Sequence, residues 1–232
     1  FIFLGISMLT AKAYRGGELR TINTYRYGRY EVQMKSALGS GVVSSFFTYR
    51  DYWADGYTGS QHWNEIDLEW LGNHDDKVQT NLIIQNAWDL PELINVDINP
   101  HEDFHTYAFE WTPSYIAFFV DEQMIRWVDN FYADSVYHYQ KIMMNIWQST
   151  NTDWVGQFDS DILPVYAFYD WVKYYAYVPG SGNTGTDNNF IQLWEDNFDF
   201  YDTARWTKAT HTWNGNNADF IHDNVVFQSG YM

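Results

Sequence analysis

The chain lacks cysteine altogether and is poor in basic residues. Without a thiol it has no disulfide framework and no thiolate nucleophile, although the absence of cysteine does not identify a compartment. Only 13 Lys and Arg stand against 30 Asp and Glu, which gives a formal net charge of −17. Phosphate backbones and anionic surfaces are bound through Lys and Arg, so this balance argues against nucleic acid, anionic membranes and acidic polysaccharides. A neutral ligand is the natural inference.

The sequence also lacks an obvious membrane span. Its most apolar stretch at the amino terminus, residues 1–13 (FIFLGISMLTAKA), is too short to cross a bilayer as a helix. The stretch has two interpretations, a signal peptide that ends at Ala-Lys-Ala or a β-strand. We favour the strand.

Aromatic residues are abundant, at 20% of the chain, with 12 Trp and 19 Tyr. One explanation is that a β-rich protein uses aromatics because strands favour them. The other is a surface that stacks on flat ligands such as sugar rings, since Trp and Tyr combine an apolar face with a polar tip. We favour stacking, because the number exceeds what a core needs.

The pattern along the chain indicates an all-β fold. Short segments with period-two alternation are separated by turn-forming stretches, which is typical of an antiparallel β-sandwich or jelly roll. The segment SYIAFFVDEQMIRWV predicts a hairpin that closes through residues 121–123, and a short helix is expected over residues 133–139. The expected strands are RYEVQMKS, VVSSFFTYR, EIDLEWLG, KVQTNLIIQ, HTYAFEW, YIAFFVDEQMIRW, KIMMNIWQ and YAFYDWVKYYAY.

Length and composition favour one domain over residues 1–232. Residues 179–189 (PGSGNTGTDNN) have the composition of a flexible linker. The segment that follows, residues 190–232, is short for an independent fold, so we expect it to supply strands to the same sandwich.

Three carboxylates alternate in HWNEIDLEWLG: Glu65, Asp67 and Glu69. In a strand these side chains share one face, while Ile66 and Leu68 point the other way. A solvated face often carries acids, but three adjacent like charges without Lys or Arg repel one another and separate their pKa values. Glycoside hydrolysis uses such a split pair. The Cα atoms of the outer two would lie about 13 Å apart, which leaves retaining and inverting mechanisms open.

The stretch WNEIDLEWLG resembles the active-site strand of the lichenase-type members of glycoside hydrolase family 16, the bacterial endo-1,3-1,4-β-glucanases. The stretches YGRYEVQMK, VVSSFFTY, KVQTN, FHTYAFEWTPSYI, KIMMNIW, DWVGQFD and YDWVKYY resemble the same family, and together they cover most of residues 18–175. The resemblance implies a concanavalin A-like jelly roll with a cleft on its concave face, and a retaining mechanism. It assigns Glu65 as nucleophile, Glu69 as general acid/base and Asp67 as the group that modulates the pair.

The order of the segments departs from ordinary members of that family. In those enzymes a segment resembling residues 189–227 lies at the amino terminus, whereas here it follows YDWVKYY through the Gly-, Ser- and Asn-rich stretch 179–189. The sequence therefore resembles a circular permutant, like one known from a rumen bacterium, with residues 179–189 joining the ancestral termini.

The resemblance also assigns residues that bind the substrate, a neutral β-glucan. They are Trp63, Glu18, Arg20, Asn81, Asn145, Trp147 and Trp154. Phe46, Phe47 and Tyr49 divide between core and cleft by strand alternation, with both assignments open. His105 is expected to be structural rather than a catalytic base.

The family commonly carries a structural calcium ion, and the resemblance places its ligands at Asp170, Asn197 and Gly230. No cofactor is expected for catalysis. The resemblance further implies a secreted, monomeric hydrolase. Two rivals remain: a hydrolase or transglycosylase on another neutral β-glucan, such as xyloglucan or laminarin, and a non-catalytic glucan-binding lectin.

Overall fold

The computed structural model describes residues 11–52, 56, 59, 62–85 and 87–232. The expected strand at the amino terminus lies almost entirely outside these residues. The described chain forms strands β1 (Tyr14–Thr21), β2 (Gly28–Lys35), β3 (Val42–Tyr49), β4 (Asn64–Leu71), β5 (Lys77–Ile84), β6 (Trp88–Asp89), β7 (Glu92–Asn95), β8 (His105–Trp111), β9 (Ile116–Val120), β10 (Gln123–Val128), β11 (Lys141–Gln148), β12 (Phe168–Tyr177), β13 (Phe190–Asp196), β14 (Trp206–Lys208) and β15 (Ala218–Phe220). The helices are α1 (Asn130–Ala133) and α2 (Thr152–Val155), with 3₁₀ turns η2 (Ser160–Ile162), η3 (Thr186–Asn188) and η4 (His222–Asn224).

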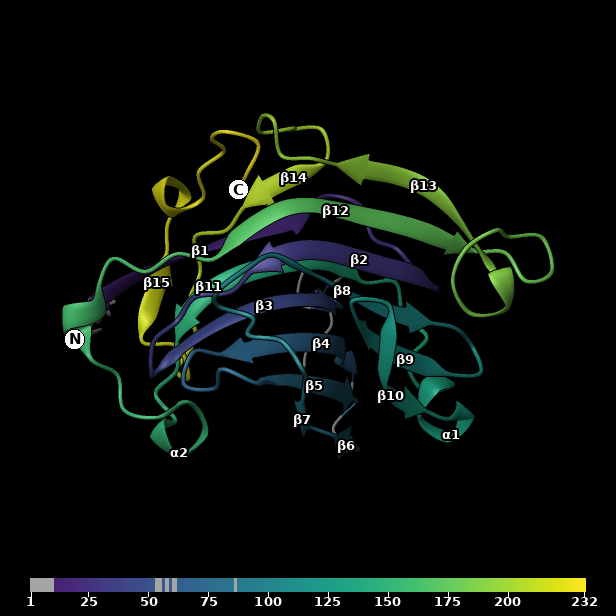
Figure 1. The fold of residues 1–232 in the computed structure, drawn as a ribbon, viewed down its shortest axis with the longest axis horizontal. Coiled ribbons are helices and arrows are strands. Elements are labelled where there is room, and N and C mark those ends of the chain that lie inside the picture. The colour runs from purple at the N-terminus through teal and green to yellow at the C-terminus, as the bar shows by residue number, and fades with distance from the viewer. Residues whose placement is uncertain (1–10, 53–55, 57–58, 60–61, 86) are drawn as a thin grey trace, which may run out of the picture.

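Within the described residues the strands form two sheets. The nine-stranded sheet has the order β14-β1-β11-β3-β4-β5-β6, with β15 beside β1 and β7 beside β5. The six-stranded sheet has the order β10-β9-β8-β2-β12-β13. Figure 1 shows the two sheets as curved, stacked layers, with β12 and β2 above β3, β4 and β5. The predicted all-β sandwich is confirmed.

The core lies between the sheets and is filled by every second side chain of the strands. On β4 the side chains of Ile66, Leu68 and Trp70 are fully buried in the main apolar cluster. They meet the inner face of the six-stranded sheet, where Tyr30 and Val32 of β2 are equally buried. The other face of β4 is therefore free to carry polar groups. No helix of the described residues has the length and apolarity needed to cross a membrane.

The predicted hairpin is formed by β9 and β10. Asp121 and Glu122 connect the strands with positive φ values of 45° and 65°, as a tight two-residue turn requires. Asp121 also contacts His105, with 2.7 Å between Oδ2 and Nδ1, on the sheet that does not carry the three alternating carboxylates. This contact agrees with a structural role for His105.

The helix expected over residues 133–139 is wrong in its bounds. Helix α1 begins at Asn130 and ends at Ala133. Asp129 sets its start, because the aspartate side chain accepts the Phe131 N–H at 3.0 Å and so caps the first turn.

The carboxyl-terminal segment contributes strands to both sheets. β13 pairs with β12, while β14 and β15 both pair with β1. The preceding Gly-rich stretch, 179–189, is tied to the six-stranded sheet, because the Thr186 N–H donates to the buried Glu110 carboxylate at 2.9 Å. It holds Gly185 with φ of 71°, and a Cβ there would lie 2.5 Å from Glu110 Oε1. Glycine therefore permits this close approach.

Candidate active site

The register of the nine-stranded sheet arranges the polar face into rows that cross the strands. Residues paired across neighbouring strands share a face. Each carboxylate of β4 therefore stands in a row of side chains contributed by the neighbouring strands. Glu69 is flanked by Ser45 on β3 and Gln79 on β5, and this row continues to Asn145 and Glu18. Asp67 lies in the row Arg20, Met143, Phe47, Asp67, Asn81, and Glu65 in the row Tyr49, Glu65, Ile83, Asp89.

This face curves around a cavity of about 920 Å³. Its lining includes all ten residues predicted to be catalytic or to bind substrate: Glu18, Arg20, Trp63, Glu65, Asp67, Glu69, Asn81, Asn145, Trp147 and Trp154. Residues distributed from position 18 to position 154 thus meet in one place.

Glu65 and Glu69 have different hydrogen-bond partners. The indole of Trp63 donates to Glu65 Oε2 at 2.5 Å, and Asp67 forms a second side-chain hydrogen bond with Glu65. Glu69 Oε2 instead accepts from Gln79 Nε2 at 2.7 Å. The two carboxyl groups are therefore held separately, on opposite sides of Asp67.

Burial raises the pKa of all three carboxyl groups. Desolvation brings the pKa of Glu65 to about 7, opposed by the hydrogen bonds from Asp67 and Trp63 that stabilise its anion. Desolvation brings the pKa of Glu69 to about 8, opposed by the Gln79 hydrogen bond. The pKa of the buried Asp67 rises well above its usual value, first through desolvation and then through the charges of Glu65 and Glu69. A protonated Asp67 can thus donate to an ionised Glu65 while Glu69 keeps its proton.

One part of the cavity wall is a charged network around Glu18 and Arg20 of β1. Arg20 donates to Glu18 Oε1, and Asn145 Nδ2 donates to Glu18 Oε2 at 3.2 Å. His211 lies against Arg20, with 2.9 Å between Nδ1 and Nη2. Burial lowers the pKa of His211, although the neighbouring Glu18 charge opposes this effect. Glu18 and Arg20 are therefore fixed in this network.

Aromatic side chains form the adjacent wall. The Trp147 ring lies 5.8 Å from that of Trp154 and 4.9 Å from that of Trp213, between centroids. Strand alternation also settles the residues of β3: Phe46 is fully buried in the core, whereas Phe47 and Tyr49 line the cavity.

The lining residues that were not identified from the sequence include Gln79, Asp89, His211 and Trp213. Gln79 had a usable signal, because it stands two residues before Asn81 in KVQTN and so shares its face. The other three lie on a two-residue strand and on the loop after β14, where no periodicity indicates a direction.

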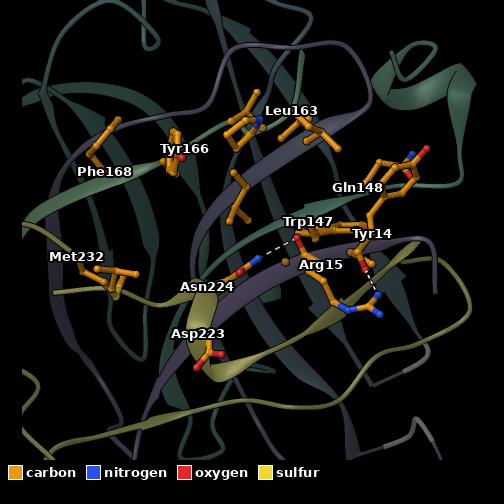
Figure 2. A pocket seen from close by; sticks show the side chains of 18 of the residues that line it. Tyr14, Arg15, Trp147, Gln148, Leu163, Tyr166, Phe168, Asp223, Asn224 and Met232 are labelled. Atoms are coloured by element: carbon orange, nitrogen blue, oxygen red, sulfur yellow. Dashed lines mark hydrogen bonds between the residues drawn. The ribbon is translucent and has the colours of Figure 1, made fainter. Parts of the chain in front are cut away.

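A second cavity, of about 1020 Å³, lies beside the first and shares Trp147 with it. Figure 2 shows its lining, with Tyr166, Phe168 and Leu163 on one side and Arg15 and Asn224 on the other. Asn224 Nδ2 donates to the Arg15 carbonyl at 3.0 Å. None of the predicted catalytic carboxylates is among its lining residues.

The predicted calcium ligands lie around the carboxyl terminus. Asp170 is at a β-bulge of β12, and the neighbouring Tyr169 exchanges two backbone hydrogen bonds of 3.0 Å with Met232. Gly230 has φ of 79°, and a Cβ there would lie 3.9 Å from Asp199 Oδ1, two residues beyond Asn197. No group of three or more His, Asp or Glu side chains arranged for a metal ion occurs within the described part of the chain. A site with one carboxylate and backbone carbonyls would not form such a group.

The fold and site together define a carbohydrate-active β-sandwich. The chain belongs to family 16 of the glycosyl hydrolases, whose family model matches residues 5–173. It is similar to the β-glucanase of Fibrobacter succinogenes, with 38% identity over 227 residues, 97% of this chain and 64% of that protein. It is also similar to the β-glucanase of Bacillus subtilis, with 41% identity over 170 residues, 72% of this chain and 66% of that protein.

Solved structures of β-glucanases are similar to this chain as well. The β-glucanase of Bacillus licheniformis matches with a TM-score of 0.61 and 38% identity, over 68% of this chain and 70% of that one. A β-1,3-1,4-glucanase (lichenase) from a mouse hindgut metagenome matches with a TM-score of 0.59 and 34% identity, over 68% and 78%. The chain spans just under two thirds of the length of the two curated relatives above.

Proposed function

We propose that this chain is a retaining endo-β-glucanase that hydrolyses mixed-linkage 1,3-1,4-β-D-glucan. The observation that carries the proposal is the placement of Glu65 and Glu69 on one face of β4, on either side of Asp67, with different partners inside an aromatic-lined cavity. The similarity to a lichenase structure supports the choice of substrate.

The proposed reaction has two steps. Glu65 attacks the anomeric carbon while Glu69 gives its proton to the departing glycosidic oxygen, so the C–O bond breaks and a glycosyl-enzyme ester forms. Glu69, now ionised, then takes a proton from water, whose oxygen displaces Glu65 from the anomeric carbon. Two inversions give net retention. The proton on Asp67 stabilises the carboxylate of Glu65 before attack and after release.

The ligand-binding part of the site suits an uncharged polysaccharide. Trp63, Trp147 and Trp154 offer flat faces to sugar rings, while Asn81 and Asn145 offer amides to hydroxyls. The proposed location is extracellular, because a polymeric glucan cannot cross a membrane to reach an internal enzyme.

The test is product release from barley mixed-linkage β-glucan, run beside laminarin, xyloglucan and carboxymethyl-cellulose. We expect oligosaccharides from the mixed-linkage glucan alone, with the β-anomer formed first when products are followed by NMR. Glu65→Gln should abolish release, whereas Glu31→Gln, which removes a buried carboxylate of the other sheet, should keep it in folded protein. Release from laminarin or xyloglucan instead would show that the enzyme acts on a different β-glucan from the one proposed. Binding without release would favour the lectin.

We further propose a structural calcium ion at Asp170, with backbone carbonyls of Asn197 and Gly230. Desolvation raises the pKa of Asp170, and among the described residues no side chain donates to its carboxylate, so a cation fits there. The ion would join β12 to the carboxyl-terminal segment and take no part in the reaction. Calcium should raise the melting temperature of the wild type and leave that of Asp170→Ala unchanged; equal shifts in both would contradict the site.

The proposed circular permutation rests on the extent of similarity. The match to the F. succinogenes protein extends over 227 residues and so includes most of residues 190–232, whereas the match to the B. subtilis protein covers 170. A chain rearranged to start at residue 190, with residue 232 joined to residue 1, should fold and hydrolyse the same glucan. Failure of this chain to fold would count against the permutation.

A further inference from the structure

Asp89 is a carboxylate of the cavity wall to which the proposed mechanism gives no role. It lies on β6, where its partner across the sheet is Ile83, and Ile83 is in turn paired with Glu65. The three residues form one row, so the Asp89 side chain is on the same face as the proposed nucleophile. It is exposed to the cavity rather than buried in the core.

The backbone around Asp89 is held firmly. The Leu90 N–H donates to the Leu82 carbonyl at 3.1 Å, and the Ala87 N–H donates to the Ile84 carbonyl at 2.8 Å. Trp88 points to the opposite face, where it packs against the core and contacts the rings of Phe131 and Tyr132. Asp89 therefore has a defined position although its strand has only two residues.

Asp89 completes the hydrogen bonding of the Asn81 amide. Asn81 Oδ1 accepts the N–H groups of Leu82 and Leu90, at 2.7 and 3.0 Å. Its Nδ2 then donates to Asp89 Oδ1 at 2.8 Å. These three bonds permit one orientation of the amide, and they leave the second Nδ2 hydrogen for a ligand. Asn81 is paired across the sheet with Asp67, so this hydrogen lies beside the catalytic strand.

We propose that Asp89 is a positioning residue of the active site, with two separable actions. Its carboxylate oxygen fixes the Asn81 amide to donate to a sugar hydroxyl, and its negative charge acts on the three carboxyl groups of β4. The inference rests on the proposed function and deepens it. It adds to the site a residue that touches neither reacting atom.

The charge of Asp89 raises the pKa of Glu65, Asp67 and Glu69, although desolvation remains the largest cause in each case. Asp89 therefore shifts the pH range of activity, which is set mainly by the burial of the three carboxyl groups. Because the carboxylate is exposed, salt should weaken its effect. The other charged or titratable groups of the cavity wall are Glu18, Arg20, Tyr49, Asp51 and His211.

Two substitutions separate the actions. Asp89→Asn keeps an oxygen that accepts from Asn81 but removes the charge, so both limbs of the pH profile of kcat/KM should move down by about 0.3–0.5 unit at low salt, with KM unchanged. Asp89→Ala removes the acceptor as well, and KM should also rise several-fold. The shift should shrink in 1 M salt. Equal KM values for the two variants would overturn the orienting action.

A matched control and a readout independent of activity complete the test. Glu92→Gln removes one negative charge from the next strand, β7, where the carboxylate contacts Arg126 outside the cavity. Carboxyl ¹³C NMR titrations of Glu65 and Glu69 should shift in Asp89→Asn and not in Glu92→Gln. Identical titrations in all three proteins would overturn the electrostatic action, whether or not the wild type releases sugar. A wild type that releases nothing would instead count against the proposed function.

Discussion

The Trp154 indole and the Gln79 amide are joined by a 2.8 Å hydrogen bond, although 75 residues separate them in sequence. Because the indole can only donate, Gln79 must present Oε1 to Trp154 and its Nε2 hydrogens to the other side. There Nε2 meets Glu69 Oε2 at 2.7 Å. Helix α2, which carries Trp154, therefore fixes the group that orients the proposed general acid.

Removing the Gln79 donor should change the pH range of activity. The Gln79 hydrogen bond lowers the pKa of Glu69, so Gln79→Leu should raise that pKa and move the alkaline limb of kcat/KM to higher pH. A lost bond to an ionised group also predicts a rate roughly 10-fold lower. Trp154→Phe should give a smaller shift in the same direction. An alkaline limb that stays in place in both variants would show that this chain of contacts does not act on Glu69.

The wild-type profile should be bell-shaped and narrow. Glu65 must be ionised to attack, so activity should be lost as the pH falls through about 7. Glu69 must be protonated to donate, so activity should be lost as the pH rises through about 8. Measuring kcat/KM on mixed-linkage glucan from pH 5 to 10 checks both limbs. A plateau from pH 5 to 7 would contradict the raised pKa of Glu65, because the group that must ionise would then already be ionised at pH 5.

The sequence predicts the two faces of strand β4 well because one period governs the whole strand. Alternation alone places Glu65, Asp67 and Glu69 on one face and Ile66 and Leu68 in the core, and the structure has this arrangement. The resemblance to the family adds residues from distant strands, which alternation cannot bring together. Neither alternation nor the family resemblance assigned Asp89 or Trp213 to the cavity. Strand β6 is too short to show a period, and Trp213 lies on a loop.

The linker shows a different limit. Composition predicts a flexible segment over residues 179–189, but the backbone of Thr186 is bonded to Glu110 and Gly185 lies against it. Glycine and asparagine are found in flexible segments, but they are equally common in ordered turns that need a positive φ. Composition alone cannot distinguish a flexible linker from an ordered turn. The residue that orders this segment is Glu110 on β8, which is far away in the sequence.

The neighbouring phenylalanines of β3 should lose different amounts of stability on truncation. Phe46 is fully buried in the main core cluster, so Phe46→Ala should cost about 3–5 kcal/mol in the free energy of unfolding. Phe47 lines the cavity, where water can fill the space left by the ring, so Phe47→Ala should cost less and should raise KM. Urea unfolding and steady-state kinetics on both variants check this. Equal stability losses would contradict the division of faces.

Trp213 should bind substrate although it comes from the carboxyl-terminal segment. Its ring lies 4.9 Å from that of Trp147 and 6.0 Å from the stacked ring of His211, at the end of the cavity beyond β1. Loss of one aromatic stacking contact of about 0.5–1.5 kcal/mol predicts that Trp213→Ala raises KM roughly 2- to 10-fold, with kcat little changed. The control is Trp127→Ala, which removes an exposed indole stacked on Tyr115 in the other sheet. If both variants kept the wild-type KM, residues 190–232 would support the fold without reaching the substrate; a fall in kcat for Trp213→Ala alone would place the ring at the reacting sugar instead.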